Sequence, residues 1–407
     1  MERLQAYKFE LCLRGAQNRL MHRFSGSCRY VYNRALALQR GRYERGERKL
    51  RYVELCKELT AWRNDPQISW LADTHSQVLQ QALKDLERAY ANFFAKRTAF
   101  PRFKRKGLHD SFRFPQGFKL DQINDRVFLP KIGWVHYRNS RSVQGEPCNV
   151  TISHGAGKWF VSVQTAREVA RPVPSSTSAI GIDLGVARFA TLSDGAVYEP
   201  LHSFKRHQQR LAHYQRMMSR RCKFGRNWQK ARRKVQKIHA RIGNCRRDYL
   251  HKISTAISKN HAMVCIEDLQ VRNLSKSSSG MVTNPGTQVR AKSGLNRSIL
   301  DQGWFEFRRQ LEYKLAWNGG ILIAVPPQNT SRECPACGHT HAANRQTQAQ
   351  FRCVECGFAA NADLVGAINV LARGHRVAAC GETSPAHGAS AQEPTEANLR
   401  EAFHAAP

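Results

Sequence analysis

Residues 179–185 read Ala-Ile-Gly-Ile-Asp-Leu-Gly, an apolar run that ends in an aspartate and a glycine. A short run of this kind is typical of a buried β-strand. Residues 189–195, Phe-Ala-Thr-Leu-Ser-Asp-Gly, end in a turn sequence, so the two runs predict a β-hairpin. Apolar runs at 264–269 and 321–325 predict two more strands. Because helical stretches separate these strands, we predict an α/β region in this part of the chain.

The residues before this region predict a different architecture. Residues 6–14 alternate in polarity as a strand does, and short strand-like segments recur from 111 to 168. Helical patterns lie between them, at residues 17–39, 52–62 and 76–94. The N-terminal part is therefore predicted to be a helical bundle inserted into a β unit, and Pro172–Ser178 is the expected linker.

Three further segments complete the α/β region and its C-terminal end. Residues 205–252 form a polar helical stretch, and residues 300–317 have the pattern of an amphipathic helix. Residues 274–293 are rich in serine and glycine, which predicts a mobile segment. Residues 376–407 are rich in alanine, serine, glycine and proline, and we expect a disordered tail there.

The charge balance indicates the class of partner. The 407 residues include 65 lysines and arginines but only 31 aspartates and glutamates, a formal net charge of +34. Nucleic acid neutralises such an excess, because basic side chains release condensed cations from its phosphates; a membrane surface is the alternative. No apolar run could span a membrane and no signal-peptide pattern opens the chain, so we expect a cytoplasmic protein with reduced cysteines.

Four of the twelve cysteines form two C-x-x-C pairs, Cys334 with Cys337 and Cys353 with Cys356, each followed by a glycine. Two pairs at this separation can place four thiolates around one zinc ion. Two unrelated reduced pairs, or a redox pair, are the alternatives. Since four thiolates leave no open coordination position, the predicted zinc site is structural.

Acidic residues stand out in so basic a chain. Asp183 ends the first strand of the α/β region, Glu267 and Asp268 end another, and Asp363 begins a helix just after the second cysteine pair. Carboxylates from two strands and a helix can converge at a sheet edge and hold two Mg²⁺ ions for phosphodiester hydrolysis. A helix N-cap for Asp363 and salt bridges for the others are the alternative. Glu267 and Asp268 point to opposite strand faces, so the pattern alone does not choose between them.

The order of these motifs resembles the TnpB (OrfB) proteins of bacterial insertion sequences, over about residues 5 to 375. The matching segments are Gly181–Gly185, Ile266–Leu269, Pro327–Gly338, Cys353–Cys356 and Asn361–Asp363, with Leu86–Phe94 and Phe100–Lys104 upstream. One departure is that the family usually carries Asn-Ala-Ala where this chain has Val365-Gly366-Ala367. TnpB proteins are RNA-guided DNA endonucleases related to the type V CRISPR effectors.

The resemblance implies a multidomain α/β fold. The expected parts are a wedge-type β-barrel at 1–15 and 108–172, a helical recognition domain at 16–107, a RuvC-like (RNase H-like) nuclease domain at 179–330 and 357–375, and a zinc ribbon at 331–356. It also implies that Asp183, Glu267 and Asp363 are the catalytic ligands of two magnesium ions, in preference to Asp268. The four cysteines would hold a structural zinc ion.

Three groups of residues are candidates for nucleic-acid binding. The stretch 205–252 carries 17 lysines and arginines against one acid, which favours a phosphate-binding helix over a merely solvated one. Its candidates are Arg220, Arg221, Lys223 and Arg226, around a predicted helix break at Gly225. Arg102, Phe103 and Lys104 pair an aromatic ring with charge, which suits an RNA–DNA duplex or a single strand, although core phenylalanines beside surface lysines fit equally well.

The third group rests on the resemblance. Tyr52, Ser76, Gln77 and Gln80 lie where the recognition domain of the family reads a short motif beside the target. Glutamine can bind adenine edges. An ordinary surface helix is the alternative for each of the four.

The function that follows is an RNA-guided, Mg²⁺-dependent endonuclease of a transposable element, which cuts double-stranded DNA next to a short transposon-adjacent motif. Its expected partners are a guide (omega) RNA and the target DNA, with a functional link to a separate transposase of the same element. One rival is a nuclease-silent RNA-guided DNA-binding regulator, against which the intact acids argue. The other is a transposase or its accessory protein, for which the chain shows no tyrosine or serine motif.

Overall fold

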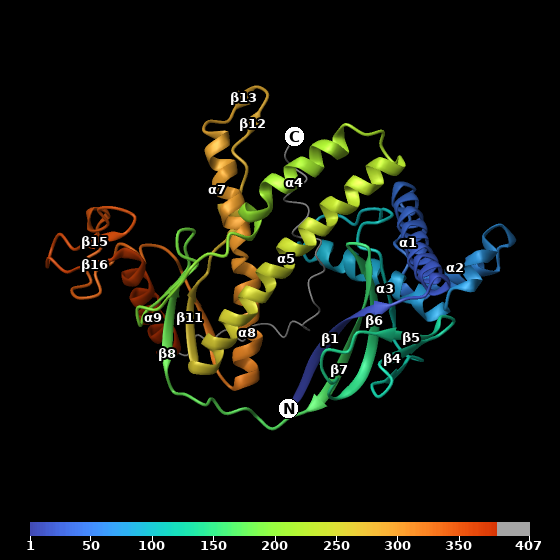
Figure 1. Ribbon diagram of the computed structural model, residues 1–407, viewed down its shortest axis with the longest axis horizontal. Helices are drawn as coiled ribbons and strands as arrows, with labels where there is room; N and C mark the ends of the chain where they lie inside the picture. Colours follow the sequence, from blue (N-terminus) through green and yellow to red (C-terminus); the bar gives the residue numbers. More distant parts are fainter. Residues whose placement is uncertain (381–407) are drawn as a thin grey trace. The chain divides into compact units, whose positions relative to one another are not determined.

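The computed structural model describes residues 1–380, and the chain divides into two compact units, Met1–Val169 and a second that begins at Ala170 (Figure 1). The division lies just before the expected linker, Pro172–Ser178. No helix in the described part of the chain is long and apolar enough to cross a membrane.

The first unit begins with a long strand, continues with helices and ends with a series of strands. In chain order its elements are β1 (Glu2–Cys12), α1 (Gly15–Glu44), α2 (Tyr52–Asn64), η1 (Pro66–Asp73), α3 (Ser76–Phe94), β2 (Ser111–Phe114), β3 (Lys119–Asp121), β4 (Arg126–Leu129), β5 (Gly133–Tyr137), β6 (Glu146–Gly155) and β7 (Lys158–Glu168). The helices are thus inserted between β1 and β2, in the order that the sequence pattern predicts.

The strands of this unit form one open antiparallel sheet in the order β2-β6-β7-β1-β5-β4-β3. The expectation of a closed barrel is wrong, because within the described residues the edge strands β2 and β3 do not pair with each other. The physical reason lies in β1, which pairs with β7 from Glu2 to Glu10 but with β5 only at Leu11 and Cys12. The two edge strands have four and three residues, and each pairs on one side only, β2 with β6 and β3 with β4.

The core of the first unit follows from the alternation of its strands. Tyr7, Phe9 and Leu11 of β1 are buried, and they share one hydrophobic cluster with buried residues of α1 and α3 such as Phe24 and Leu83. Burial of these large side chains stabilises the unit by about 25 cal/mol per Å² of apolar surface removed from water.

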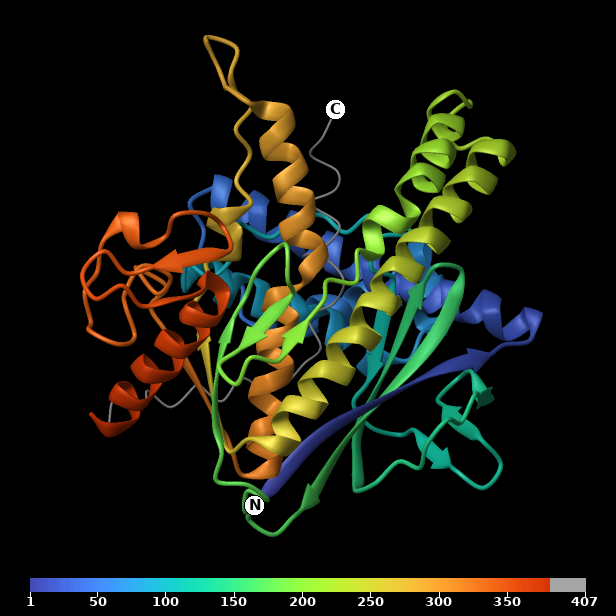
Figure 2. The same cartoon turned by 60° about the vertical axis from the view of Figure 1, so that its left-hand side comes forward.

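The second unit contains a mixed sheet with helices on both faces (Figure 2). Its elements are β8 (Ala179–Asp183), β9 (Ala190–Leu192), β10 (Val197–Tyr198), α4 (Ser203–Ser219), α5 (Arg226–Asn260), β11 (Met263–Glu267), α6 (Val271–Leu274), β12 (Gly280–Met281), β13 (Asn284–Pro285), α7 (Val289–Gln302), α8 (Trp304–Asn318), β14 (Ile321–Val325), η2 (Ala342–Asn344), β15 (Gln350–Arg352), β16 (Ala359–Asn361) and α9 (Ala362–Ala379). The fold of the chain is therefore mixed α/β.

The main sheet of this unit has the order β10-β9-β8-β11-β14. β8 and β9 form the predicted antiparallel hairpin, and β8, β11 and β14 run parallel. Ile180 and Ile182 of β8 pack with residues of α5 and α8 on one face. Cys265 of β11 packs with Ile323 of β14 and Val370 of α9 on the other.

Gly181 allows helix α9 to approach the sheet. A Cβ built on Gly181 would lie 2.2 Å from the carbonyl oxygen of Ala367, so no larger residue fits there. Since side chains alternate along a strand, Asp183 and Glu267, two residues after Gly181 and Cys265, also face α9. The packing that buries α9 thereby turns both carboxylates toward the same helix.

One helical prediction needs correction, and two other segments contain more regular structure than the sequence pattern indicated. The helix expected at 300–317 is two helices, α7 and α8, which are separated by Gly303 with a φ of 75° in the left-handed region that glycine favours. The segment 274–293 contains the β12–β13 hairpin and the start of α7, and its mobility stays a prediction. Helix α9 continues to Ala379, so residues 376–379 are helical, and the rest of the expected tail, 381–407, lies outside the described residues.

Candidate functional site: an acidic pocket beside a four-cysteine cluster

Three carboxylates line one pocket of about 280 Å³ in the second unit. Asp183 ends β8, Glu267 ends the neighbouring parallel strand β11, and Asp363 stands in the first turn of α9. The carboxyl ends of parallel strands meet at one edge of a sheet, where ligands commonly bind. The structure therefore brings together the three acids that the sequence analysis singled out.

Asp268 lies elsewhere, although it follows Glu267 directly. Its carboxylate forms an ion pair with Arg308 of α8, and it is not among the residues that line the pocket. The other alternative, that Asp363 caps its helix, does not hold either. Asn361 is the N-cap, and its Oδ1 accepts hydrogen bonds from the backbone amides of Asp363 at 3.0 Å and Leu364 at 3.4 Å. The carboxylate of Asp363 thus remains available to the pocket.

Positive charge compensates the acids of the pocket only in part. Burial, together with the neighbouring charges of Glu267 and Asp363, raises the pKa of Asp183 to about 8, and Arg345 offsets this only in part. Burial also raises the pKa of Glu267, against the hydrogen bond from Thr330 and the charges of Arg373 and Arg345. Buried carboxylates that repel one another in this way are a favourable environment for bound cations.

The donor atoms of the three acids suit a hard cation. Each side chain offers carboxylate oxygens to the same pocket, and oxygen ligands are what Mg²⁺ prefers. The donor set therefore fits a divalent cation such as magnesium.

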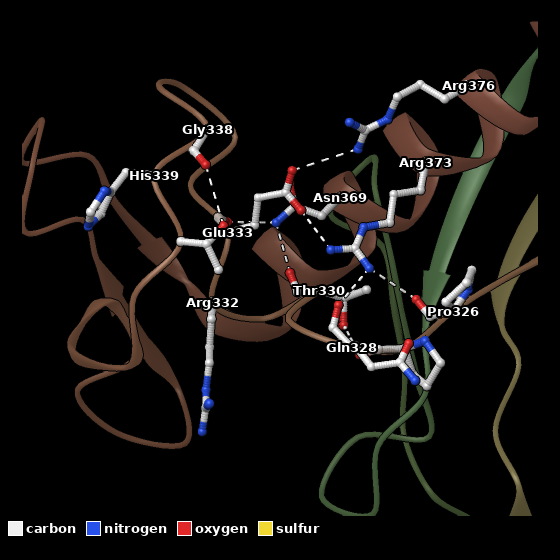
Figure 3. Close-up of polar contacts among 12 residues, drawn as sticks. Pro326, Gln328, Thr330, Arg332, Glu333, Gly338, His339, Asn369, Arg373 and Arg376 are labelled. Carbon is white, nitrogen blue, oxygen red and sulfur yellow. Dashed lines mark hydrogen bonds and ion pairs between the residues drawn. The ribbon is translucent and has the colours of Figure 1, made fainter.

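Glu267 is held by Thr330, which belongs to a loop that hydrogen bonds tie to helix α9 (Figure 3 shows the contacts of Thr330, Glu333, Asn369, Arg373 and Arg376). The Thr330 hydroxyl donates to Glu267 Oε1 at 2.7 Å. Asn369 of α9 donates to the carbonyl oxygens of Thr330 at 2.8 Å and Glu333 at 2.7 Å, and Arg373 forms a 2.7 Å bond with Glu333 Oε2. Arg373 also donates to the carbonyl oxygens of Pro326 at 3.0 Å and Gln328 at 2.6 Å, and Arg376 lies 3.7 Å from Glu333 Oε1. Helix α9 thus holds the loop that orients Glu267.

Sequence reasoning gave no role to several other residues that line the pocket, among them Arg345 and Thr330. Arg345, between η2 and β15, lines the pocket and places Nη2 3.8 Å from Asp363 Oδ1. Among so many arginines nothing in the pattern distinguished it. Thr330 lies inside the segment Pro327–Gly338 that carries the family resemblance, so the signal was present although no role was assigned to it.

The four predicted zinc ligands lie together. The Sγ atoms of Cys334 and Cys356 are 3.6 Å apart, as are those of Cys337 and Cys353, and all four lie within 4.8 Å of one another as free thiols. Sulfur atoms bound tetrahedrally to zinc at about 2.3 Å would be about 3.8 Å apart. The cluster therefore fits a structural zinc ion.

Asn344 braces the two cysteine turns against each other and was also missed. This residue is fully buried, and its Nδ2 donates to the carbonyl oxygens of Arg332 at 2.9 Å and His339 at 3.0 Å. Its Oδ1 accepts a hydrogen bond from the backbone amide of Val354 at 3.0 Å. The side chain therefore ties the first cysteine turn to the second.

The basic candidates of the long helical stretch lie at one turn. Arg220, Arg221, Lys223 and Arg226 are all exposed around the connection between α4 and α5, where the predicted break at Gly225 occurs. Within residues 1–380 none of these four cations forms an ion pair. Their positive charges thus face solvent at the tip of a helical hairpin.

The second group lies on a surface loop of the first unit. Phe103 is 45% exposed, so the alternative of a core phenylalanine is wrong for this residue. The guanidinium of Arg40 lies 4.9 Å from the centre of its ring. Arg102 is exposed and Lys104 is half-buried. Asn33 of α1 holds the backbone of Lys104 through two hydrogen bonds of 2.9 and 2.7 Å. The loop therefore presents an aromatic ring and cations on an anchored backbone.

The third group lies on two helices of the same unit. Tyr52 begins α2, Ser76 and Gln77 begin α3, and Gln80 follows on α3; all four are half-buried. Lys84 places Nζ 5.5 Å from the centre of the Tyr52 ring. A role for these residues in reading a DNA motif stays a prediction.

Three family models match parts of the chain. One, described as "Probable transposase" (OrfB_IS605), matches residues 160–278, and one, described as "Cas12f1-like, TNB domain", matches residues 304–370. The third, described as "Helix-turn-helix domain", matches residues 1–48, which in this structure form β1 and one long helix, α1.

Curated relatives match nearly the whole chain. InsQ of Escherichia coli K12, named "Putative RNA-guided DNA endonuclease", is 57% identical over 97% of this chain and 98% of its own length. A Streptomyces pristinaespiralis protein of the same name is 36% identical over 93% of this chain and 91% of its own. A solved mini-RNA-guided endonuclease, CRISPR-Cas phi3, aligns with 12% identity and a TM-score of 0.44 over 93% of this chain and 92% of its own. From the two curated relatives and the transposase match, the chain belongs to the TnpB (OrfB) family.

Proposed function

We propose that this chain is an RNA-guided endonuclease that hydrolyses double-stranded DNA at the acidic pocket, by a RuvC-like reaction that depends on Mg²⁺. The observation that carries the proposal is that Asp183, Glu267 and Asp363 line one pocket of a chain with a net charge of +34. A positively charged protein retains phosphodiester substrates, and clustered buried acids are the ligands that hydrolysis of such substrates requires. The names of the curated relatives support the same class of activity.

The proposed roles follow from the positions of the side chains. Asp183, Glu267 and Asp363 would hold the metal ions, with Glu267 oriented by Thr330. Mg²⁺ bound there would supply Lewis-acid stabilisation of the phosphodiester and would lower the pKa of a coordinated water. Arg345 contributes a guanidinium to the pocket, and a guanidinium can donate hydrogen bonds to two oxygens of one phosphate at once.

Specificity is proposed to come from two sources. A guide RNA would read the target by base pairing, and the first unit would read a short transposon-adjacent motif in the duplex. Tyr52, Ser76, Gln77 and Gln80 are the candidates for motif reading, and the exposed cations of the loop around Phe103 and of the α4–α5 turn are candidates for phosphate binding. A functional link to a separate transposase of the same element belongs to the same proposal.

The test is cleavage of a matched plasmid by the purified protein–RNA complex with Mg²⁺ or with EDTA. We expect Asp183→Ala, Glu267→Ala and Asp363→Ala each to abolish cleavage within assay limits, because each removes a metal ligand. Without its metal ligand the activation barrier should rise by several kcal/mol. Because about 1.4 kcal/mol corresponds to a tenfold change in rate, cleavage should slow a thousandfold or more. The affinity for RNA and DNA should hardly change, since basic residues carry it.

Asp268→Ala is the matched control, because Asp268 is the adjacent carboxylate and pairs with Arg308 outside the pocket. It should cut at close to the normal rate. Near-normal cleavage by Asp183→Ala, or loss of cleavage in Asp268→Ala alone, would show that the active site lies elsewhere. A complex that binds its target but never cuts would support the nuclease-silent regulator, and a joined product would support the transposase.

A further inference from the structure

The tip of the α4–α5 hairpin carries two aromatic side chains as well as its cations. Phe224 is 67% exposed, and Trp228, in the first turn of α5, is half-buried. Their ring centres are 5.4 Å apart with an angle of 60° between the planes. The hydrophobic cluster of the hairpin is formed by other residues, among them Leu211 and Val235. The two rings therefore form an aromatic pair outside the hydrophobic cluster of the hairpin.

Phe224 also has a backbone conformation that is rare for its type. Its φ is 69°, in the left-handed region where bulky side chains are disfavoured. The turn is nevertheless fixed, because Gln229 Nε2 donates to the carbonyl oxygen of Phe224 at 2.8 Å and the Gly225 amide donates to that of Cys222 at 3.1 Å. Backbone strain of this kind concentrates at functional sites. Here it holds an exposed aromatic ring in place without burying it.

A positively charged side chain lies against each ring. Lys223 Nζ lies 5.5 Å from the centre of the Phe224 ring, and the guanidinium of Arg232 lies 5.4 Å from that of Trp228. No acidic residue occurs between Glu199 and Asp248. The N-terminus of the 35-residue helix α5 is also at this tip, and no side chain caps it at Gly225. The tip therefore offers aromatic faces together with donors for phosphate oxygens.

We propose that the tip of the α4–α5 hairpin is a stacking platform for an unpaired nucleotide, with Phe224 and Trp228 against the base and the surrounding cations on the flanking phosphates. An unpaired base fits better than a base pair inside a duplex, because its faces are free, whereas a paired base must first be unstacked. The nucleotide could come from the guide RNA or from a single strand of the target DNA. The inference rests on the proposed nucleic-acid binding but not on cleavage.

The experiment measures the affinity of the full-length protein for fluorescein-labelled single strands. Three probes are used: a DNA oligonucleotide, an RNA of the same sequence, and a DNA of the same length in which every base is replaced by an abasic spacer. The variant is Phe224→Leu/Trp228→Leu, which keeps apolar side chains but removes the aromatic faces. We expect its Kd for at least one base-containing strand to rise on the order of tenfold, with little change for the abasic strand.

Two variants serve as controls. Phe305→Leu removes an equally exposed phenylalanine, 67%, from α8 of the same unit and should bind all three probes as the wild type does. Phe224→Trp/Trp228→Phe keeps both aromatic faces and should restore the affinity, which separates stacking from any loss of fold. The base-containing strand that shows the larger loss identifies RNA or DNA as the source of the nucleotide.

Equal affinities of the leucine variant and the wild type for the DNA and RNA strands would overturn the stacking platform, as would an equal loss on the abasic strand. Either result would leave the proposed nuclease untouched, provided that the wild type binds the strands and the complex cuts its target. A wild-type protein that binds no nucleic acid would instead refute the proposed function itself.

Discussion

Gly366 of α9 lies directly against the side chain of Asp183. A Cβ built on Gly366 would stand 3.2 Å from Asp183 Cγ and 3.3 Å from its Oδ1. Within a helix glycine is about 1 kcal/mol less favourable than alanine, so its presence here needs a reason. The absent side chain leaves room for the Asp183 carboxylate, whose pKa is already raised by burial and by two neighbouring acids. This position is also where the chain departs from the alanine usual in its family.

Gly366→Ala tests that relationship. We expect the free energy of unfolding to rise by about 0.5 kcal/mol, because the gain in helix propensity exceeds the cost of a small shift of Asp183 toward the open pocket. Cleavage should stay within a few-fold of normal, whereas the bulkier Gly366→Val should lower it more than tenfold. Chemical denaturation and plasmid cleavage measure the two effects. An alanine variant that unfolds more easily than the wild type would mean that Asp183 cannot move.

A second prediction concerns the four-cysteine cluster. Cys334→Ser should release one zinc ion per chain and should also lower cleavage at least tenfold. The reason is that the cluster supports both Arg345, which lines the acidic pocket, and Asp363, which lies seven residues after Cys356. Metal analysis and plasmid cleavage give the two readouts. Cys148→Ser, at an exposed free cysteine of the first unit, should change neither. Full activity of a zinc-free variant would break the link between the cluster and the pocket.

Much of the fold could be predicted because local patterns decide it. The hairpin of β8 and β9 and the parallel strands β11 and β14 correspond to the apolar runs that begin at Ala179, Phe189, Val264 and Ile321. The break between α7 and α8 was missed because an amphipathic pattern continues across Gly303, and only the backbone reveals its left-handed φ. The open sheet of the first unit was missed because closure depends on strand pairing over long separations, which one sequence does not show.

The candidate site divides in the same way. The cysteine spacing predicted the metal cluster. Strand alternation placed Glu267 and Asp268 on opposite faces of the strand but did not choose between them, and the family resemblance favoured Glu267. Thr330 and Arg345 reach the pocket from loops, where no periodicity indicates the direction of a side chain. The exposed pair of Phe224 and Trp228 was missed for another reason, which is that an aromatic residue in a basic stretch reads equally well as core.

A third prediction follows from the pKa of Asp183, which is raised to about 8 in the folded, metal-free protein from an ordinary value of 3.8. The unfolded chain releases this proton at a lower pH than the folded chain does. The carboxyl therefore destabilises the folded state progressively as pH rises from about 4 to about 8. Its full favourable contribution to the free energy of unfolding is present only below that range. Asp183→Asn, which stays neutral, should consequently be more stable than the wild type at pH 8.5 in EDTA.

The measurement is the Tm of both proteins in EDTA across that pH range. The advantage of Asp183→Asn should be several degrees at pH 8.5 and should shrink toward pH 4. Asp268→Asn is the control, because Asp268 lies outside the pocket and is paired with Arg308. Added Mg²⁺ should raise the Tm of the wild type more than that of Asp183→Asn, since the ions bind the ionised acid. A Tm difference that does not vary with pH would contradict the proposed burial of Asp183.

The last prediction concerns Thr330, which positions Glu267 through a 2.7 Å hydrogen bond and is itself held by Asn369 of α9. Thr330→Val keeps the shape of the side chain but removes the donor. We expect cleavage to fall on the order of tenfold, as is common when a partner of a metal ligand is lost. The hydrogen bond also lowers the pKa of Glu267 against the effect of burial, so its loss should move the acid limb of the pH–rate profile to higher pH.

Two variants serve as controls for Thr330→Val. Thr330→Ser restores a hydroxyl and should recover most of the rate and the original pH–rate profile. Thr340→Val, at an exposed threonine near the cysteine cluster, should leave the rate and the profile unchanged. A Thr330→Val enzyme that is slower at every pH by the same factor would show that Thr330 supports the loop but does not act on the Glu267 carboxylate.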